Sequence, residues 1–381
     1  MTDQSLYAAL DVSLETTTVC IMARDGSLIQ EAVVPSDPTA LSACLEEHRD
    51  GLERIGLEAG PLSEWIVRGL ADHGLTAILM ETRQVRAALS AQIVKTDRKD
   101  ARGMAHLLRT GWFRPVHVKT MDAREQRAML SARATLVARL KDVENSVRGL
   151  LRGFGLRLPR TLRGRWDAGV RDLIAGHAVL LQILEPLLVA RGALREQLIV
   201  LDKRVRDRAR ADPVCRRLMT APGVGAIVAL TFRAAVDQPE RFRSSKQVGA
   251  CFGLTPRKYQ SGETDRDGAI SRAGDASVRV ALFEAAHVIM TRVASWSKLK
   301  AWAMNVARRR GAKRAKVALA RKLGIVLHRM WVDETDFRFR EPAHAWEGAQ
   351  ARSAQPDNPR SPTGRQGGDV GSGQAAGCLG A

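Results

Sequence analysis

The sequence predicts an α/β N-terminal region, a helical arm in the middle of the chain and a mainly α C-terminal region. Three observations carry this prediction. Short β-rich runs alternate with turn residues over roughly the first 80 positions, apolar residues then recur at spacings of three and four, and glycine-bearing turns separate helical stretches after position 213. With 381 residues, the chain is long enough for two or three domains, each with its own core.

The N-terminal region alternates strands and helices. Strands are expected at 6–12, 17–22 and 27–34, and a helix at 38–47. A fourth strand at 52–57 ends at Glu58, a helix at 61–73 follows it, and a fifth strand covers 76–80. The order β-β-β-α-β-α-β is that of an RNase H-like fold and indicates a mixed sheet covered by helices. We place this domain at 1–122.

The remaining chain divides into three parts. Residues 123–212 are predicted to form a long antiparallel helical arm, interrupted near Pro159, and residues 213–336 a second compact domain. The stretch after about Glu341 is rich in Gly, Ser, Pro, Ala and Gln and poor in large apolar residues. We therefore expect a disordered tail over 337–381.

The charge of the chain is far from balanced. Its 60 Lys and Arg against 41 Asp and Glu give a net charge of +19, which favours a polyanionic partner because each neutralised phosphate releases counterions. Ribosomal and membrane-surface proteins share such a balance, so charge alone leaves the partner open. The five scattered cysteines favour neither a disulfide framework nor a structural zinc site. Without a signal pattern or a long apolar run, we expect a cytoplasmic protein with no membrane partner.

Four acidic residues form the first candidate site: Asp11, Glu58, Asp97 and Asp100. Asp11 and Glu58 end strands that are neighbours in an RNase H-like sheet, and Asp97 and Asp100 share one helix face because they are three residues apart. Two-metal phosphodiester chemistry needs converging carboxylates, and Mg²⁺ prefers oxygen ligands.

Plainer interpretations of these acids stay open. Asp97 could cap the helix, Asp100 could interact with its dipole, and Glu58 could be a turn residue. Asp11 is harder to explain in this way, because aspartate has a poor strand propensity.

The second region contains two glycine-bearing motifs. Residues 218–230 resemble a helix-hairpin-helix turn, in which Gly223 and Gly225 would let backbone N–H groups approach a phosphate. A glycine-bearing loop between two core helices is the alternative. In the second motif, Ser261 lies in a polar, Gly-flanked loop and could attack a phosphorus atom, although a loop serine is commonly structural. The surrounding basic residues that would stabilise the developing charge are Arg257, Lys258, Arg266, Arg272 and Arg279.

A third basic element carries no acidic residue. It comprises Arg308, Arg309, Arg310, Lys313, Arg314, Lys316, Arg321 and Lys322. It could be a solvated helix face, but in a chain of this charge we expect a groove for a nucleic-acid backbone.

Taken together, these motifs resemble the transposases of the insertion-sequence one-ten family, relatives of the pilin-gene invertase Piv. The resemblance covers about residues 5–335. It rests on Leu10-Asp11, Glu58-Ala59-Gly60, the run 95–102, Pro222-Gly223-Val224-Gly225, Gly253-Leu254-Thr255-Pro256-Arg257 and Tyr259-Gln260-Ser261-Gly262.

The resemblance implies a RuvC-like DEDD domain followed by a transposase domain that carries a serine. Asp11, Glu58, Asp97 and Asp100 would be the metal-binding quartet, and Ser261 the nucleophile. Members of this family are recombinases that form a covalent phosphoserine link to DNA, act as dimers or tetramers, and use a noncoding bridge RNA that pairs with donor and target DNA.

We therefore expect Ser261 to attack a DNA phosphodiester while Mg²⁺ on the quartet polarises the phosphate. Because the two motifs are far apart in sequence, the site would be composite, with the helical arm acting in assembly. Two alternatives remain: a metal-dependent nuclease of the junction-resolvase type that uses water, and a non-catalytic RNA-binding protein whose acids are structural.

Overall fold

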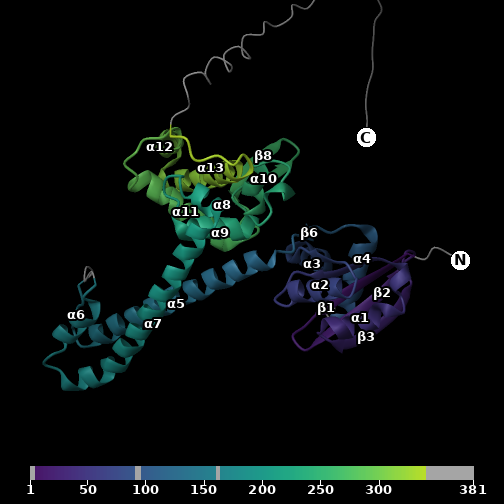
Figure 1. Ribbon diagram of the computed structural model, residues 1–381, viewed down its shortest axis with the longest axis horizontal. Coiled ribbons are helices and arrows are strands. Elements are labelled where there is room, and N and C mark those ends of the chain that lie inside the picture. Colours follow the sequence, from purple (N-terminus) through teal and green to yellow (C-terminus); the bar gives the residue numbers. More distant parts are fainter. Residues whose placement is uncertain (1–4, 91–95, 160–163, 340–381) are drawn as a thin grey trace, which may run out of the picture.

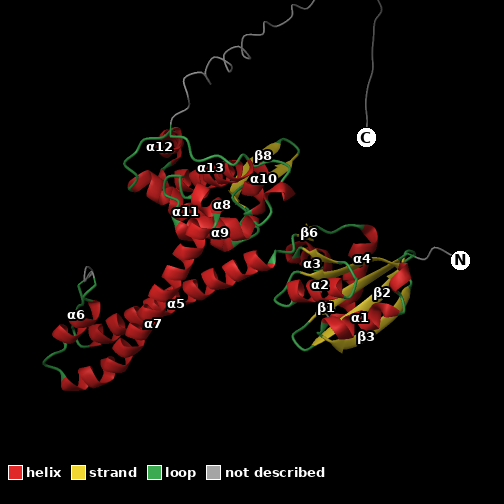
Figure 2. Cartoon of the chain, in the orientation of Figure 1, coloured by secondary structure: helices red, strands yellow, loops and turns green. Residues whose placement is uncertain are grey.

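The computed structural model describes residues 5–90, 96–159 and 164–339. Its N-terminal part is a six-stranded mixed sheet in the order β3-β2-β1-β4-β5-β6. Figure 2 shows the strands of this sheet in yellow beside red helices. The strands are β1 (Leu6–Val12), β2 (Thr16–Ala23), β3 (Leu28–Pro35), β4 (Leu52–Glu58), β5 (Ala77–Met80) and β6 (Pro115–Val116). Strands β1, β4 and β5 run parallel, while β2, β3 and β6 pair antiparallel with their neighbours. The expected mixed sheet and the order β-β-β-α-β-α-β are confirmed.

Helices cover both faces of this sheet. On one face, α1 (Pro38–Glu46) and α2 (Ser63–Asp72) bury Leu41 and Ile66 against the strand residues Leu10 and Leu57. On the other face, α3 (Thr82–Leu89) and α4 (Asp97–Thr110) pack on a second apolar cluster that includes Ala9, Met80 and Leu108. The helix expected from 61 begins at Ser63, because the Ser63 hydroxyl closes a turn on the Gly60 carbonyl at 2.8 Å.

Two long helices follow the sheet. Helix α5 (Met121–Gly153) leads away from it and α7 (Ala178–Ala211) returns antiparallel, with the short α6 (Trp166–Leu173) packed near the far end (Figure 1). There Arg191 is almost fully buried, pairs with Glu144 and Asp167 at 2.7 Å each, and lies over the Trp166 ring. The helical arm expected from the sequence is therefore present.

The C-terminal part is mainly helical. Its helices α8 (Pro213–Leu218), α9 (Ala226–Val236), α10 (Lys246–Cys251), α11 (Ala276–Thr291), α12 (Lys298–Arg310) and α13 (Ala312–Val332) enclose one apolar core, from which the hairpin of β7 (Pro256–Ser261) and β8 (Thr264–Ile270) extends. Short 3₁₀ turns occupy Arg49–Gly51 and Pro239–Arg241. No helix in the described ranges is long and apolar enough to cross a membrane.

The tail prediction needs one change at its start. Phe337, which we assigned to the tail, packs against the C-terminal core, and its backbone N–H donates to the Thr220 hydroxyl at 2.8 Å. Residues 340–381, with Cys378, lie outside the described residues, so the predicted disorder there and the three other domain boundaries stay predictions. The four cysteines within the described chain are free.

Candidate nucleic-acid-processing site

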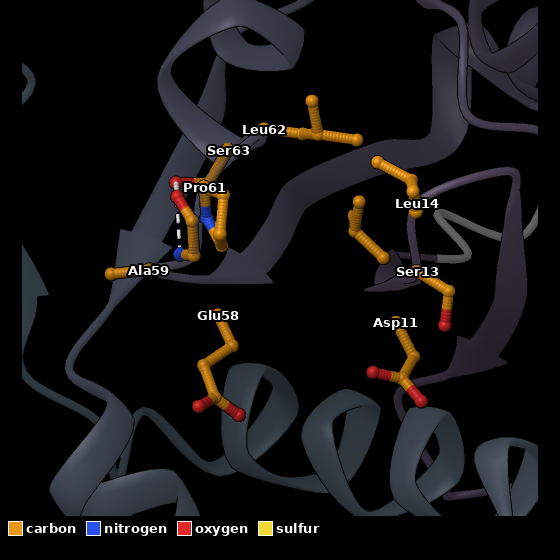
Figure 3. A pocket seen from close by; sticks show the side chains of 10 residues that line it. Asp11, Ser13, Leu14, Glu58, Ala59, Pro61, Leu62 and Ser63 are labelled. Carbon is orange, nitrogen blue, oxygen red and sulfur yellow. Dashed lines mark hydrogen bonds between the residues drawn. The ribbon is translucent and has the colours of Figure 1, made fainter. Parts of the chain in front are cut away.

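Asp11 and Glu58 lie side by side at one edge of the sheet. Strands β1 and β4 are parallel and pair Leu10 with Leu57, so the next residue on each strand is one of these acids. Adjacent strands lie about 4.8 Å apart, which brings the two carboxylates to neighbouring positions. In Figure 3 both side chains point to the same side.

Strand alternation decides which face these acids occupy. Leu10 and Leu57 point toward α1 and α2, so Asp11 and Glu58 point toward the opposite face. Gly56, two residues before Glu58, confirms the assignment, because a Cβ built on it would lie 2.5 Å from the side chain of Leu108 in α4. Asp11 and Glu58 therefore lie on the face that α4 covers.

Helix α4 runs antiparallel to β1, and this brings its first turn to the same edge. Near its end, Arg109 donates to the Arg24 carbonyl at 2.9 Å, beside the start of β1. In its middle, Arg102 pairs with Glu31 at 2.5 Å, level with Ala9 through the strand register. Its start, with Asp97 and Asp100, therefore lies beside the end of β1. The topology brings the four predicted acids to one edge of the sheet.

The capping interpretation of Asp97 is wrong. Thr96 is the N-cap of α4, and its hydroxyl accepts from the Lys99 backbone N–H at 3.3 Å. Asp97 is exposed in the first turn, whereas Asp11, Glu58 and Asp100 are half-buried and have interactions within the protein. Lys95, the first residue of the predicted motif, lies outside the described residues.

A pocket of about 270 Å³ opens beside Asp11 and Glu58 (Figure 3). Its lining comes only from residues 11–14 and 58–63. The donor atoms of the quartet are carboxylate oxygens, which suit a hard divalent cation. Within the described chain, no three carboxylate, imidazole or thiol groups are already close enough together to hold a metal ion. The donor chemistry therefore fits a divalent metal, but the carboxylates would have to close around it.

Ser261 differs from the expected loop residue. It ends β7 at the tip of the hairpin, pairs with Thr264 and is exposed, and the turn Gly262–Glu263 follows it. Gly262 has a φ of +54°, a left-handed conformation that glycine adopts without strain. Ser261 does not line the Asp11–Glu58 pocket.

The basic residues around Ser261 fall into two groups. Arg257 and Lys258 are exposed on β7, where Lys258 pairs with Asp265 at 3.0 Å. Arg272 and Arg279 lie at the base of the hairpin, where the Nη1 of Arg279 donates to three carbonyls, of Phe252, Ala273 and Gly274. Arg279 therefore fixes the loop that carries Arg272, in addition to any contact with a ligand.

The two motif glycines have different environments. Gly223 has a φ of +74°, and a Cβ on it would lie 2.7 Å from the Ala285 carbonyl of α11, so this glycine allows close helix packing. Gly225 is exposed at the N-cap of α9, with no atom within 4 Å of an added Cβ. Only Gly225 leaves room for a phosphate to approach.

Arg308, Arg309 and Arg310 are exposed in the last turn of α12, and in the part of the chain that the structure describes none of them makes an ion pair. The dipole of α12 stabilises cations at this end whatever their function. Their position is therefore compatible with both a solvated face and a polyanion-binding face.

One residue near the predicted site was missed. Arg83 in α3 donates from Nη2 to the Arg272 carbonyl at 2.9 Å, although 189 residues separate the two. Nothing in the local pattern around Arg83 distinguishes it from the exposed Arg86 on the same helix.

A mixed sheet with four acids at one edge, joined to an arginine-rich helical unit in a chain of net charge +19, is the combination expected of proteins that act on nucleic-acid phosphodiesters. Comparison with known sequences narrows the class. Residues 8–155 match the DEDD transposase profile of the IS110 type, and residues 215–301 match the profile described as transposase IS116/IS110/IS902 family.

Several transposases are similar in sequence to most of this chain. The transposase for insertion sequence element IS1111A of Coxiella burnetii is 28% identical over 73% of this chain and 77% of the relative. A probable family 20 transposase of Pseudomonas aeruginosa is 27% identical over 74% of this chain and 85% of the relative. The transposase for insertion sequence element IS1328 of Yersinia enterocolitica is 26% identical over 74% of this chain and 83% of the relative. The chain belongs to the IS110/IS116/IS902 family of insertion-sequence transposases. The DEDD type implies use of a divalent metal, and transposases bind DNA.

Proposed function

We propose that this transposase cuts and rejoins DNA through a covalent phosphoserine intermediate, with Ser261 as the nucleophile and the N-terminal acids as its metal-holding partners. The observation that supports this most directly is the arrangement of Asp11, Glu58, Asp97 and Asp100 at one edge of what we take to be a RuvC-like sheet. The exposed tip of the β7–β8 hairpin leaves the Ser261 hydroxyl accessible to a DNA backbone.

In the proposed step, the Ser261 Oγ loses its proton and forms a bond to phosphorus, the bond from phosphorus to one deoxyribose oxygen breaks, and that oxygen takes up a proton in place of the one that Ser261 lost. The serine ester keeps the bond energy for rejoining, so recombination needs no external energy source. Asp11, Glu58, Asp97 and Asp100 would hold Mg²⁺, which when bound supplies polarisation of the phosphate. Arg257 and Arg266 on the hairpin would hold the DNA backbone near the serine.

The test is the covalent adduct between protein and labelled DNA. Ser261→Ala should abolish an adduct that survives denaturation, whereas Ser271→Ala, which removes a serine beyond the base of the same hairpin, should retain it. An intact adduct in Ser261→Ala would exclude the serine as nucleophile.

A water-dependent nuclease remains the second candidate, because the Asp11–Glu58 pocket is lined without Ser261. This candidate predicts that Ser261→Ala still nicks DNA and that Asp11→Asn does not. Loss of cleavage in both variants favours the phosphoserine reaction. A non-catalytic protein would show the same activity in Asp11→Asn and Asp97→Asn as in the wild type.

We also propose that a noncoding bridge RNA guides the reaction and that the protein acts as a homo-oligomer. The support is the net charge of +19 and the exposed basic surface, including Arg308, Arg309 and Arg310. Purifying the protein from cells that carry the whole element and sequencing the bound RNA should yield one enriched transcript from the element. Absence of any enriched RNA would contradict the guided reaction.

A further inference from the structure

The base of the β7–β8 hairpin is one of the places where the N-terminal sheet unit contacts the C-terminal unit. Arg272 has a φ of +55°, a conformation that non-glycine residues seldom adopt, and its carbonyl accepts the hydrogen bond from Arg83. Arg83 belongs to α3, which follows β5, the strand beside Glu58. Strained backbone of this kind is retained where the surrounding structure or a function requires it.

Three arginines, Arg83, Arg272 and Arg279, meet at this contact. Arg279 is fixed by its three carbonyl acceptors, and burial lowers the pKa of its guanidinium, with the positive charges of Arg83 and Arg272 acting in the same direction and that of Asp275 opposing them. Arg83 donates to the Arg272 carbonyl and Arg279 donates to the carbonyl of the next residue, Ala273, so the three arginines are close neighbours.

The acid whose charge acts on Arg279, Asp275, is already paired with another arginine. Asp275, the acid nearest in sequence to Arg272 and Arg279, pairs with Arg127 and also accepts from Ser277. Glu81, two residues before Arg83, pairs with Arg114. Over residues 5–90, 96–159 and 164–339, no ion pair involves Arg83, Arg272 or Arg279. Like charges in this arrangement repel one another, so an anion bound among them would stabilise the contact.

A pocket of about 290 Å³ lies at the same place. Arg272 and Arg279 line it, with Leu254, Ile270 and Phe283 among its apolar walls. Apolar walls reduce the screening by water, so each arginine–anion contact becomes stronger. The acidic residue of the lining, Glu284, is exposed, and water screens its charge.

We propose that Arg83, Arg272 and Arg279 together bind one backbone phosphate of a nucleic acid and thereby hold the sheet unit against the base of the hairpin that carries Ser261. This inference rests on the proposed function, since it takes a nucleic acid as the ligand. Arg83 is the new member, and its role is to position the two halves of the site. The shared chemistry is a phosphodiester, which DNA and RNA both supply.

The test measures binding to a short DNA duplex and, separately, to an RNA hairpin, at several salt concentrations. All variants carry Ser261→Ala, so that no cleavage interferes. Arg83→Ala should weaken binding on the order of tenfold and reduce the slope of log K against log salt by about one. Arg86→Ala removes the same charge from the same helix without touching the Arg272 loop, and should leave the slope unchanged.

A double-mutant comparison decides whether the arginines share one phosphate. Arg272→Asn tolerates the left-handed backbone and removes the guanidinium. If both side chains bind one phosphate, the variant with both substitutions should lose no more slope than Arg83→Ala alone. The probe that shows this loss, DNA or RNA, identifies the source of the phosphate.

Two outcomes would contradict this proposal without contradicting the proposed function. Arg83→Ala could behave like Arg86→Ala, or the double variant could lose a slope of about two, as expected for two separate phosphates. If the Ser261→Ala protein binds neither probe, this inference and the proposed function both fail. The adduct experiment then reports on the proposed function separately, because it does not depend on Arg83.

Discussion

At the scale of single residues, the two glycines before α9 make different contributions to stability. Gly223→Ala should destabilise the protein by about 2–4 kcal/mol, because the new Cβ would meet the backbone of α11 and the φ of +74° disfavours alanine. Gly225→Ala should change the free energy of unfolding by less than about 1 kcal/mol, since the space around it is open. Urea unfolding of both variants measures the difference.

The same two variants, Gly223→Ala and Gly225→Ala, distinguish a phosphate-binding turn from a loop that only joins two core helices. If Gly225 lets a backbone N–H approach a phosphate, Gly225→Ala should weaken DNA binding while its stability stays close to that of the wild type. Equal destabilisation by the two substitutions would contradict the packing role of Gly223.

The carboxylate site was predictable from the sequence to a large extent. Asp11 and Glu58 each end an apolar strand, and the strand order of the fold makes those strands neighbours, so local pattern and topology together place both acids. The role of Asp97 could not be decided in this way, because Thr96 and Asp97 are both good N-cap residues and only the structure shows which one caps.

Ser261 shows where local pattern fails. The strand Pro256–Ser261 is exposed along its whole length and therefore lacks the apolar alternation that identifies a half-buried strand. The contact of Arg83 with Arg272 could not be predicted from the sequence for another reason. It depends on how two units far apart in sequence pack together.

At the scale of elements, α4 connects helix capping to metal binding. Thr96→Ala should cost about 1 kcal/mol and loosen the first turn, which carries Asp97 and Asp100. Under the proposed function, the variant should then need more Mg²⁺ for half-maximal DNA cleavage. Thr96→Ser retains the capping oxygen and should behave as the wild type. An unchanged Mg²⁺ requirement in Thr96→Ala would show that this turn does not position metal ligands.

Two short elements, β6 and α3, could not be predicted from the sequence pattern, for physical reasons. Strand β6 has two residues, too few for any periodicity. Helix α3 buries only Val85 among its eight residues, with Ala88 and Leu89 partly buried beside it, so its apolar stripe is too short to recognise. Long helices whose apolar residues recur at spacings of three and four, such as α5 and α7, were predicted correctly.

The junction between the sheet and α5 depends on one buried acid. Asp237 accepts from the Thr120 backbone N–H at 2.9 Å, from the Thr120 hydroxyl at 2.6 Å and from His117 Nε2 at 2.8 Å. Burial raises the pKa of Asp237, but the hydrogen bonds from Thr120 and His117 outweigh it, so the pKa lies below its ordinary value of 3.8. The stabilisation is therefore present above about pH 4 and is lost as the pH falls through the lowered pKa.

Because the pKa of Asp237 is lowered, the stability of the protein should depend on pH in the acidic range. Wild-type protein should lose stability on acidification below about pH 4, and Asp237→Asn should lose less over the same range, because asparagine does not titrate there. Asparagine also tolerates the φ of 62° at this position. Urea unfolding at a series of acidic pH values checks this, and Thr120→Val, which removes one donor, should give an intermediate dependence. Identical profiles for wild type and Asp237→Asn would exclude the carboxylate as a source of acid sensitivity.

At the scale of the whole molecule, the acids and the serine of the proposed reaction lie in different units of the chain. The sheet unit and the C-terminal unit lie at the same end of the α5–α7 arm (Figure 1), yet the acid-lined pocket contains no residue of the C-terminal unit. Ser261 lies at the tip of its hairpin, about 17 Å from the hairpin base at 3.3 Å per residue. A serine extended in this way can serve the acids of a second copy more readily than a serine held in a closed pocket.

Mixing two inactive variants tests this directly. Asp11→Asn leaves Ser261 intact, and Ser261→Ala leaves the acids intact, so each should be inactive alone. If each site takes acids from one subunit and serine from another, co-expressed variants should regain adduct formation. Random dimers with two such sites would reach about a quarter of wild-type activity, because half are mixed and each mixed dimer has one complete site. Activity no higher than that of either variant alone would mean that Ser261 serves the acids of its own chain, through a closure of the hairpin toward the pocket.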